Sequence, residues 1–182
     1  MDAQAIQRKR ADGVLVDAHA AYITVSGVKR QVWPERKYII RNGVQDNAIT
    51  GGWKWIKVVG TPAATWKNGY LELTNQYDNG STNYYITQKT IPLDGKSVLC
   101  ITLEVTTNGE LHGQHIGLWN SNSFAANKLD GQIYACNFLQ SNIQKQTIRI
   151  PFYAATGKYL GIGVEAIGGT TVLKVYDVWL EK

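Results

Sequence analysis

Several features are scarce in this chain of 182 residues, and each scarcity excludes a class of protein. Only 18% of the residues are charged, against 44% hydrophobic residues, which excludes a disordered chain. No apolar run approaches the roughly 20 residues that cross a bilayer. The first ten residues, MDAQAIQRKR, lack the apolar segment of a signal peptide. We therefore expect a soluble globular protein with no signal peptide and no membrane insertion.

Cysteine is also scarce, with two residues in the whole chain, Cys100 and Cys136. Neither belongs to a CxxC motif or to a Cys/His cluster, so the sequence offers no zinc site. Both lie inside strand-like runs. We expect two buried free thiols, with a disulfide between them as the alternative.

Catalytic motifs are absent as well. There is no GxSxG motif, no P-loop and no dinucleotide-binding glycine motif. A glycosidase needs two carboxylates roughly 5 to 10 Å apart, whereas Glu72, Glu104 and Glu165 lie on three different expected strands. His112 and His115 lack a third ligand nearby. We predict no enzymatic activity, no cofactor and no metal, and a polysaccharide-degrading enzyme stays as an alternative.

The net charge of +5 is concentrated at the start of the chain. Residues 1–41 hold eight Lys and Arg against four Asp and Glu, and the densest run is Arg8-Lys9-Arg10. The sequence contains no recognition helix, zinc spacing or RNA-binding aromatic motif. We therefore expect a solvated basic arm rather than a specific nucleic-acid site.

Short β-rich runs that alternate apolar and polar residues dominate the chain after residue 36. The clearest is Ser97–Thr106, in which Leu99 and Ile101 share one face with Leu103 and Val105. The expected strands are Tyr38–Arg41, Trp53–Val59, Tyr70–Thr74, Asn83–Ile91, Ser97–Thr106, His115–Trp119, Ile133–Leu139, Thr147–Phe152, Tyr159–Glu165 and Thr171–Leu180. A loop containing Pro62 and Trp66 is expected between the second and the third.

These runs predict an all-β domain, a two-sheet antiparallel β-sandwich with a jelly roll as first choice. The inward set is predicted to be Leu99, Ile101, Leu103, Val105, Ile116, Leu118, Ile148, Ile150, Leu160, Ile162 and Val164. In Tyr159–Glu165 the glycines at 161 and 163 occupy the opposite face, where they leave room for a close approach. The last strand is apolar in both registers, so we expect it to be central or bulged.

A short arm is predicted before the sandwich. Residues 1–21 carry a weak helical or irregular pattern, and YITVSGVKRQVW, residues 22–33, predicts a β-hairpin that turns at Ser26-Gly27. Pro34-Glu35-Arg36 breaks the pattern. We place the boundary there, which gives an arm at 1–36 and a sandwich domain at 37–182.

Four motifs resemble a known group when they are taken together. ITGGW at residues 49–53, YYITQKTIPLDGKSVLCITLEVT at 84–106, QTIRIPFYAATGKYLGIGVEA at 146–166 and VYDVWLE at 175–181 occur in this order. The chain resembles, over about residues 22–182, the C-terminal jelly-roll domains of tail and appendage proteins from phages and prophages of Firmicutes. The hairpin at 22–33 is similar to those that join such domains to the tail stalk.

This resemblance implies a carbohydrate-binding-like module in a virion. It implies adhesion to host-surface glycan as the function, other virion proteins as partners, and a virion or extracellular location. Phage appendages are commonly trimeric, so it also implies a homo-oligomer. A purely structural virion component without a glycan ligand is the alternative. The sequence does not identify the glycan or the host.

The candidate glycan site follows from one strand and the loops beside it. Ile116 and Leu118 define the core side of His115–Trp119, so His115 and Trp119 face the other way. Aromatic rings and side-chain amides are the groups that bind sugars, and the loop at Tyr77–Tyr85 is rich in both. The predicted ligand-binding residues are His115, Trp119, Tyr77, Asn79, Tyr85, Asn120 and Trp55. In the alternative, Trp119 closes the edge of the sandwich.

The stretch ITGGWKWI, residues 49–56, places Trp53 and Trp55 on the same face of an expected strand. Two exposed tryptophans would form a flat shelf for a ligand, but leaving both in water is costly without a partner. We expect one of them in the core and the other partly exposed.

Overall fold

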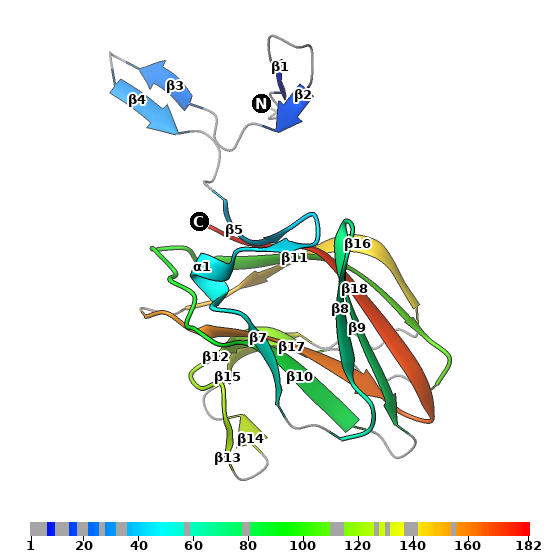
Figure 1. Cartoon of the computed structure of the whole chain (residues 1–182). Coiled ribbons are helices and arrows are strands. Elements are labelled where there is room, and N and C mark those ends of the chain that lie inside the picture. Colours follow the sequence, from blue (N-terminus) through cyan, green and yellow to red (C-terminus); the bar gives the residue numbers. More distant parts are fainter. Residues whose placement is uncertain are drawn as a thin grey trace.

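The protein is a two-sheet antiparallel β-sandwich (Figure 1). The computed structural model describes residues 7–9, 15–17, 22–25, 28–31, 36–56, 59–77, 81–109, 115–125, 128–129, 132–136, 142–153 and 156–182. Strands that follow each other in sequence mostly alternate between the two sheets. The predicted fold class is therefore confirmed. Among the described residues, helix is confined to the single turn α1 (Asn47–Thr50), capped by the Asp46 side chain.

We call the two layers the small sheet and the large sheet. The small sheet has the order β15 (Gln132–Cys136), β12 (His115–Trp119), β17 (Tyr159–Ala166), β10 (Ser81–Thr87) and β7 (Trp53–Ile56). The large sheet has the order β16 (Asn142–Pro151), β11 (Val98–Thr107), β18 (Gly169–Glu181), β5 (Lys37–Arg41) and β6 (Val44–Gln45). Strand β9 (Tyr70–Tyr77) pairs with the first half of β18 and with β8 (Ala63–Lys67).

The remaining described strands form short hairpins of their own. In the predicted arm, β1 (Gln7–Lys9) pairs with β2 (Leu15–Asp17), and β3 (Tyr22–Val25) pairs with β4 (Val28–Gln31). The second of these confirms the pairing predicted for the hairpin, with Tyr22–Val25 against Val28–Gln31; the predicted turn at Ser26-Gly27 lies outside the described residues. The first corrects the irregular pattern expected there. Strands β13 (Phe124–Ala125) and β14 (Lys128–Leu129) form a third hairpin.

The core lies between the two sheets and contains the predicted inward set. All eleven predicted residues except Ile148 are buried, and Ile148 is partly buried against the same cluster. The alternation of apolar and polar residues in β11 therefore correctly predicted which face of the strand points to the core. Each buried aliphatic side chain contributes roughly 1.5 to 3 kcal/mol of transfer free energy, which makes this cluster the main source of stability.

Strand β18 is both central and bulged, as its apolar residues in two registers indicated. Thr102 pairs with Asp177, but Leu103 pairs with Val175, so Tyr176 is the extra residue of a bulge. The bulge turns Tyr176 and Asp177 to the same outer face. After it, Val178 faces the core and Trp179 faces outward.

Two expected loops contain strand. Residues 63–67, expected in a loop with Trp66, form β8, because Ala64 and Trp66 can pack on the core while their neighbours stay exposed. The expected loop Tyr77–Tyr85 is mostly the end of β9 and the start of β10, with residues 78–80 outside the described part. The polar residues Ser81, Thr82 and Asn83 lie in β10, although a polar run of this kind is typical of a loop.

Two further expectations concern cysteine and the membrane. Cys100 is a buried free thiol, as expected. The Cys136 side chain lies outside the described residues, so the prediction for it is not tested.

No helix in the described part of the chain is long and apolar enough to span a bilayer.

Candidate functional site

The strand β12 has the orientation predicted from its alternation. Ile116 and Leu118 belong to the core cluster, and Trp119 lies on the opposite face of the small sheet in a second cluster with Ile56 and Ile86. His115 lies beside Tyr84 on that face, with 6.2 Å between ring centroids. We call this outer surface of the small sheet the aromatic face.

The exposure predicted for Trp119 is wrong. Its side chain is only 2% exposed. The indole packs against Gly161, where an added Cβ would overlap its Nε1 atom, and Tyr84 packs edge-on against it at 5.5 Å. Gly163 makes the same room for the Tyr84 ring. The glycines of β17 thus permit a close approach as predicted, but the protein's own rings make that approach.

Tyr85 and Trp55 lie on the other side of the small sheet from Trp119. Tyr85 pairs with Ile162 and Trp55 in register, so both aromatic side chains point towards the core. The rings of Trp55 and Tyr85 are 5.0 Å apart, and Trp53 stacks on Tyr85 at 5.3 Å. Trp53 is buried and Trp55 is half-buried, which confirms one core and one partly exposed tryptophan.

The seven predicted ligand residues therefore do not form one surface. Asn120 is exposed at the end of β12, where its Oδ1 accepts a hydrogen bond from Lys158. The side chains of Tyr77 and Asn79 lie outside the described residues, as does His112. A ligand role for any of the seven stays a prediction.

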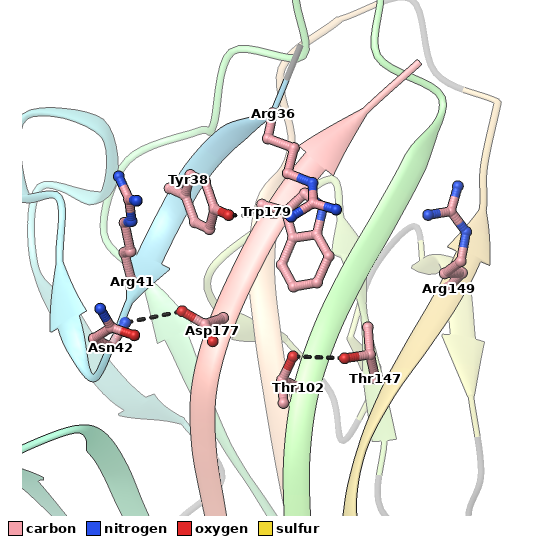
Figure 2. Close-up of a pocket in the computed structure, with 9 residues that line it drawn as sticks. All are labelled: Arg36, Tyr38, Arg41, Asn42, Thr102, Thr147, Arg149, Asp177 and Trp179. Carbon is pink, nitrogen blue, oxygen red and sulfur yellow. Dashed lines mark hydrogen bonds between the residues drawn. The ribbon is translucent and has the colours of Figure 1, made fainter. Parts of the chain in front are cut away.

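The outer face of the large sheet carries an open groove of about 470 Å³. We call it the arginine groove. Figure 2 shows Tyr38, Trp179 and Asp177 on its floor, with Arg41 on one side and Arg149 on the other. The complete lining is Arg36, Tyr38, Arg41, Asn42, Thr102, Thr147, Arg149, Asp177 and Trp179. Its volume is in the range of small-molecule sites.

A tight turn and a bulge position one wall of the groove. The turn between β5 and β6 is Asn42-Gly43, with φ of 49° and 71°, the left-handed conformation that this dipeptide favours. Asp177, brought outward by the bulge in β18, accepts a hydrogen bond from the Asn42 backbone N–H at 2.9 Å. The turn therefore holds Arg41 and Asn42 at the rim.

A buried carboxylate lies beneath the other wall. Glu181 is fully buried and forms ion pairs with Arg149 and, at 3.7 Å, with Arg36. The Trp179 indole N–H donates to it at 3.1 Å, and the Cys100 thiol donates to it at 3.3 Å. One carboxylate thus holds two guanidinium groups, and the Arg36 guanidinium stacks on the Trp179 ring at 5.0 Å.

The same contacts make Cys100 unreactive. Burial, together with the hydrogen bond to Glu181, raises the pKa of the Cys100 thiol to about 12. The thiolate is the nucleophile and the metal ligand, so this cysteine carries neither chemistry at neutral pH.

Cations and aromatic rings continue beyond the groove on the outer face of the large sheet. The Lys145 ammonium lies 3.7 Å from the Tyr176 ring centroid. Glu104 accepts hydrogen bonds from Lys174 at 2.8 Å and from Tyr176 at 2.9 Å, and these bonds lower the pKa of the Glu104 carboxyl.

The polar groups of the groove can form hydrogen bonds with a ligand. Asp177 is the only acidic residue that lines the groove, and within the described residues no group of three His, Cys, Asp or Glu could hold a metal ion. Hydroxyls of Thr102 and Thr147, 2.8 Å apart, and the Asn42 amide can exchange hydrogen bonds with a polyol.

No local sequence pattern predicted this groove. Its residues come from four strands and from two positions beside β5, Arg36 and Asn42, so no short motif contains them. One signal was present: in the last strand, Tyr176, Asp177 and Trp179 interrupt an apolar alternation that Val178 and Leu180 continue. Polar and aromatic residues on the outer face of a central strand could have indicated a binding surface.

Comparison with known proteins finds similarity of fold only. No protein-family model matches the chain, and no curated protein does. Among solved structures, a family 29 carbohydrate-binding module matches with a TM-score of 0.51 at 11% identity, covering 82% of this chain and 90% of that chain. A variant of such a module complexed with mannohexaose matches with a TM-score of 0.52 at 11% identity, over 82% and 93%. These likenesses show a shared β-sandwich fold.

Proposed function

We propose that this chain is a non-catalytic glycan-binding module and that the arginine groove is its binding site. The observation that carries the proposal is the combination, in one open groove, of the half-buried Tyr38 ring with hydroxyl, amide, carboxylate and guanidinium groups. The second ring of the groove, Trp179, is 6% exposed and supports the floor from below. Sugars present hydroxyl groups to such polar side chains and C–H groups to aromatic rings. Related folds in complex with mannohexaose and cellulohexaose support a glycan as the ligand.

The geometry favours the arginine groove over the aromatic face. The largest ring is buried on both faces, Trp119 at 2% exposed and Trp179 at 6%, but the groove also has the half-buried Tyr38 ring beside exposed arginines. Backbone pairing of β5, β18, β11 and β16 fixes the floor of the groove, so little ordering is needed on binding. We expect dissociation constants between about 1 µM and 1 mM, equivalent to about −8 to −4 kcal/mol.

The test is a glycan array that includes cell-wall polysaccharides, followed by titration calorimetry with the best ligand. Tyr38→Ala should weaken binding about ten-fold or more, equivalent to about 1.4 kcal/mol, because it removes a ring from the groove floor. Tyr38→Phe is the matched control, since it keeps the ring and removes only the hydroxyl. Unchanged affinity in Tyr38→Ala would exclude the groove, and Trp55→Ala would then test the aromatic cluster at the sandwich edge.

A structural component without a glycan ligand is the second candidate. It is favoured by the rings of the aromatic face, which are engaged with each other rather than free for a ligand. A chain of this kind should give no signal on the array and should bury the arginine groove against a protein partner.

The biological setting rests on the sequence resemblance alone. We propose a phage or prophage tail appendage that attaches to host-surface glycan, with the chain in the virion or outside the cell. A homo-oligomer, a trimer in the simplest case, would raise weak affinity through several sites. Sedimentation equilibrium of the full chain tests this, and a monomer at micromolar concentration would contradict it.

A further inference from the structure

We infer that the arginine groove selects glycans whose repeat unit carries an anionic group, either a carboxylate or a phosphate diester. The inference rests on the proposed function and specifies its ligand class. Three of the nine lining residues are arginines, and only Asp177 is acidic. Guanidinium groups in excess of the carboxylates favour an anionic ligand over a neutral one.

The charge balance of the groove leaves guanidinium groups without full compensation. Arg36 and Arg149 share the single carboxylate of Glu181, although their side chains are 43% and 57% exposed. Arg41 is exposed and forms no ion pair with any described residue; its guanidinium stacks over the Tyr38 ring at 4.9 Å. The groove and the carboxylate beneath it therefore have a net positive charge.

The guanidinium groups on one side are held in place before any ligand arrives. Glu181 anchors Arg149 and Arg36 from below, and the Trp179 ring supports Arg36 from one face. A guanidinium has five N–H donors in a planar fork that matches carboxylate and phosphate oxygens. Since Glu181 occupies only part of each fork, the remaining donors can bind an anion from the groove.

The positions of the arginines fit an extended chain better than a single ion. Arg41 ends β5 and Arg149 lies on β16, and the strand order places β18 and β11 between them. Three strand spacings amount to roughly 14 Å. Between the two arginines lie the hydroxyls of Thr102 and Thr147 and the Asp177 carboxylate (Figure 2). Such a surface can bind the hydroxyls of a sugar chain while arginines bind its charges.

The test compares probes that differ in charge and in sugar content. Polygalacturonate carries carboxylates, poly(glycerol phosphate) carries phosphate diesters, galactan is neutral, and polyglutamate is a polyanion without hydroxyls. Calorimetry or affinity electrophoresis of the full chain should show binding to one of the first two at least about ten-fold tighter than to galactan. That binding should weaken as salt rises, because ionic contacts are screened.

The variant Arg41→Gln tests the groove, because this arginine is exposed and its loss leaves no buried carboxylate unpaired. We expect about a five-fold to ten-fold loss of affinity for the anionic glycan. Lys54→Gln is the matched control: it removes the same charge from the outer face of the small sheet and should bind like the native chain. An equal loss in both variants would mean that only overall charge matters, which would overturn the assignment to the groove.

The remaining outcomes separate this inference from the proposed function. Galactan that binds as tightly as the anionic glycans would overturn the anion selectivity and leave glycan binding in place. Polyglutamate that binds as tightly would overturn recognition of the sugar. If no probe binds and the glycan array is also negative, both proposals fail.

Discussion

The outer faces of the two sheets are built on the same kind of strand but have opposite properties. On the small sheet, Gly161 and Gly163 let the rings of Trp119 and Tyr84 pack directly against the backbone. These rings pack together, so the Trp119 ring is not available to a ligand. On the large sheet, arginines, threonines and Asp177 leave an open groove. Aromatic residues therefore do not mark a binding surface by themselves. Whether an aromatic ring is exposed depends on the size of the residues at the neighbouring positions: small residues let the ring pack against the sheet.

The largest expected effect is on the outer face of the small sheet. Trp119→Ala should lower the free energy of unfolding by about 3 to 5 kcal/mol, because it removes a buried ring and leaves a cavity. Urea unfolding followed by circular dichroism measures this. Tyr38→Ala on the open face is the counterpart and should cost about 1 kcal/mol or less. A nearly neutral Trp119→Ala would show that its ring is not part of the packed structure and would restore it as a ligand platform.

An intermediate effect is expected at the glycine beneath that ring. Gly161→Ala should cost about 1 to 3 kcal/mol, since the new Cβ overlaps the Trp119 indole and the ring has to move. The double variant Gly161→Ala/Trp119→Ala is the control. Its cost should be smaller than the sum of the two single variants, because the overlap disappears with the ring. Strict additivity would contradict the contact.

The smallest effect concerns the polar contacts of the open face. The pKa of the Glu104 carboxyl is lowered from 4.5, first by its bond from Lys174 and then by that from Tyr176. Its contribution is therefore present above pH 4.5 and is lost as the pH falls through the lowered pKa. Glu104→Gln should cost up to about 1 kcal/mol at neutral pH and nothing once the native carboxyl is protonated.

Urea unfolding of the native chain and of Glu104→Gln at neutral pH and at about pH 2 measures this difference. The gap between them should also shrink in about 1 M salt. A gap that does not change with pH would mean that Glu104 acts through packing rather than through charge.

The fold and its core followed from the sequence because they depend on local alternation. Leu99, Ile101 and Leu103 share a face in any extended strand, and a large apolar face has to be buried. The orientation of His115 and Trp119 followed for the same reason. The strand β8 was not predicted because it is short. Only two of its residues, Ala64 and Trp66, alternate with exposed neighbours.

The binding surfaces could be predicted less well from the sequence, because the exposure of a side chain depends on its neighbours in other strands. Alternation places Trp119 on the outer face but does not reveal that Gly161 lies beside it in the next strand. It also places Tyr84 and Tyr85 on opposite faces. Which of the two points towards the core depends on the pairing of β10 with β17, in which Tyr85 lies opposite Ile162.

By itself the sequence determined an all-β sandwich, its core residues and a last strand that is central or bulged. All of these depend on residues close together in the chain. Only the tertiary structure decided that Glu181 is buried beneath Arg36 and Arg149, that Trp119 is covered, and that β5, β18, β11 and β16 bring the arginine groove together. The physical reason is strand pairing: it joins residues more than a hundred positions apart, and no local pattern records which strands become neighbours.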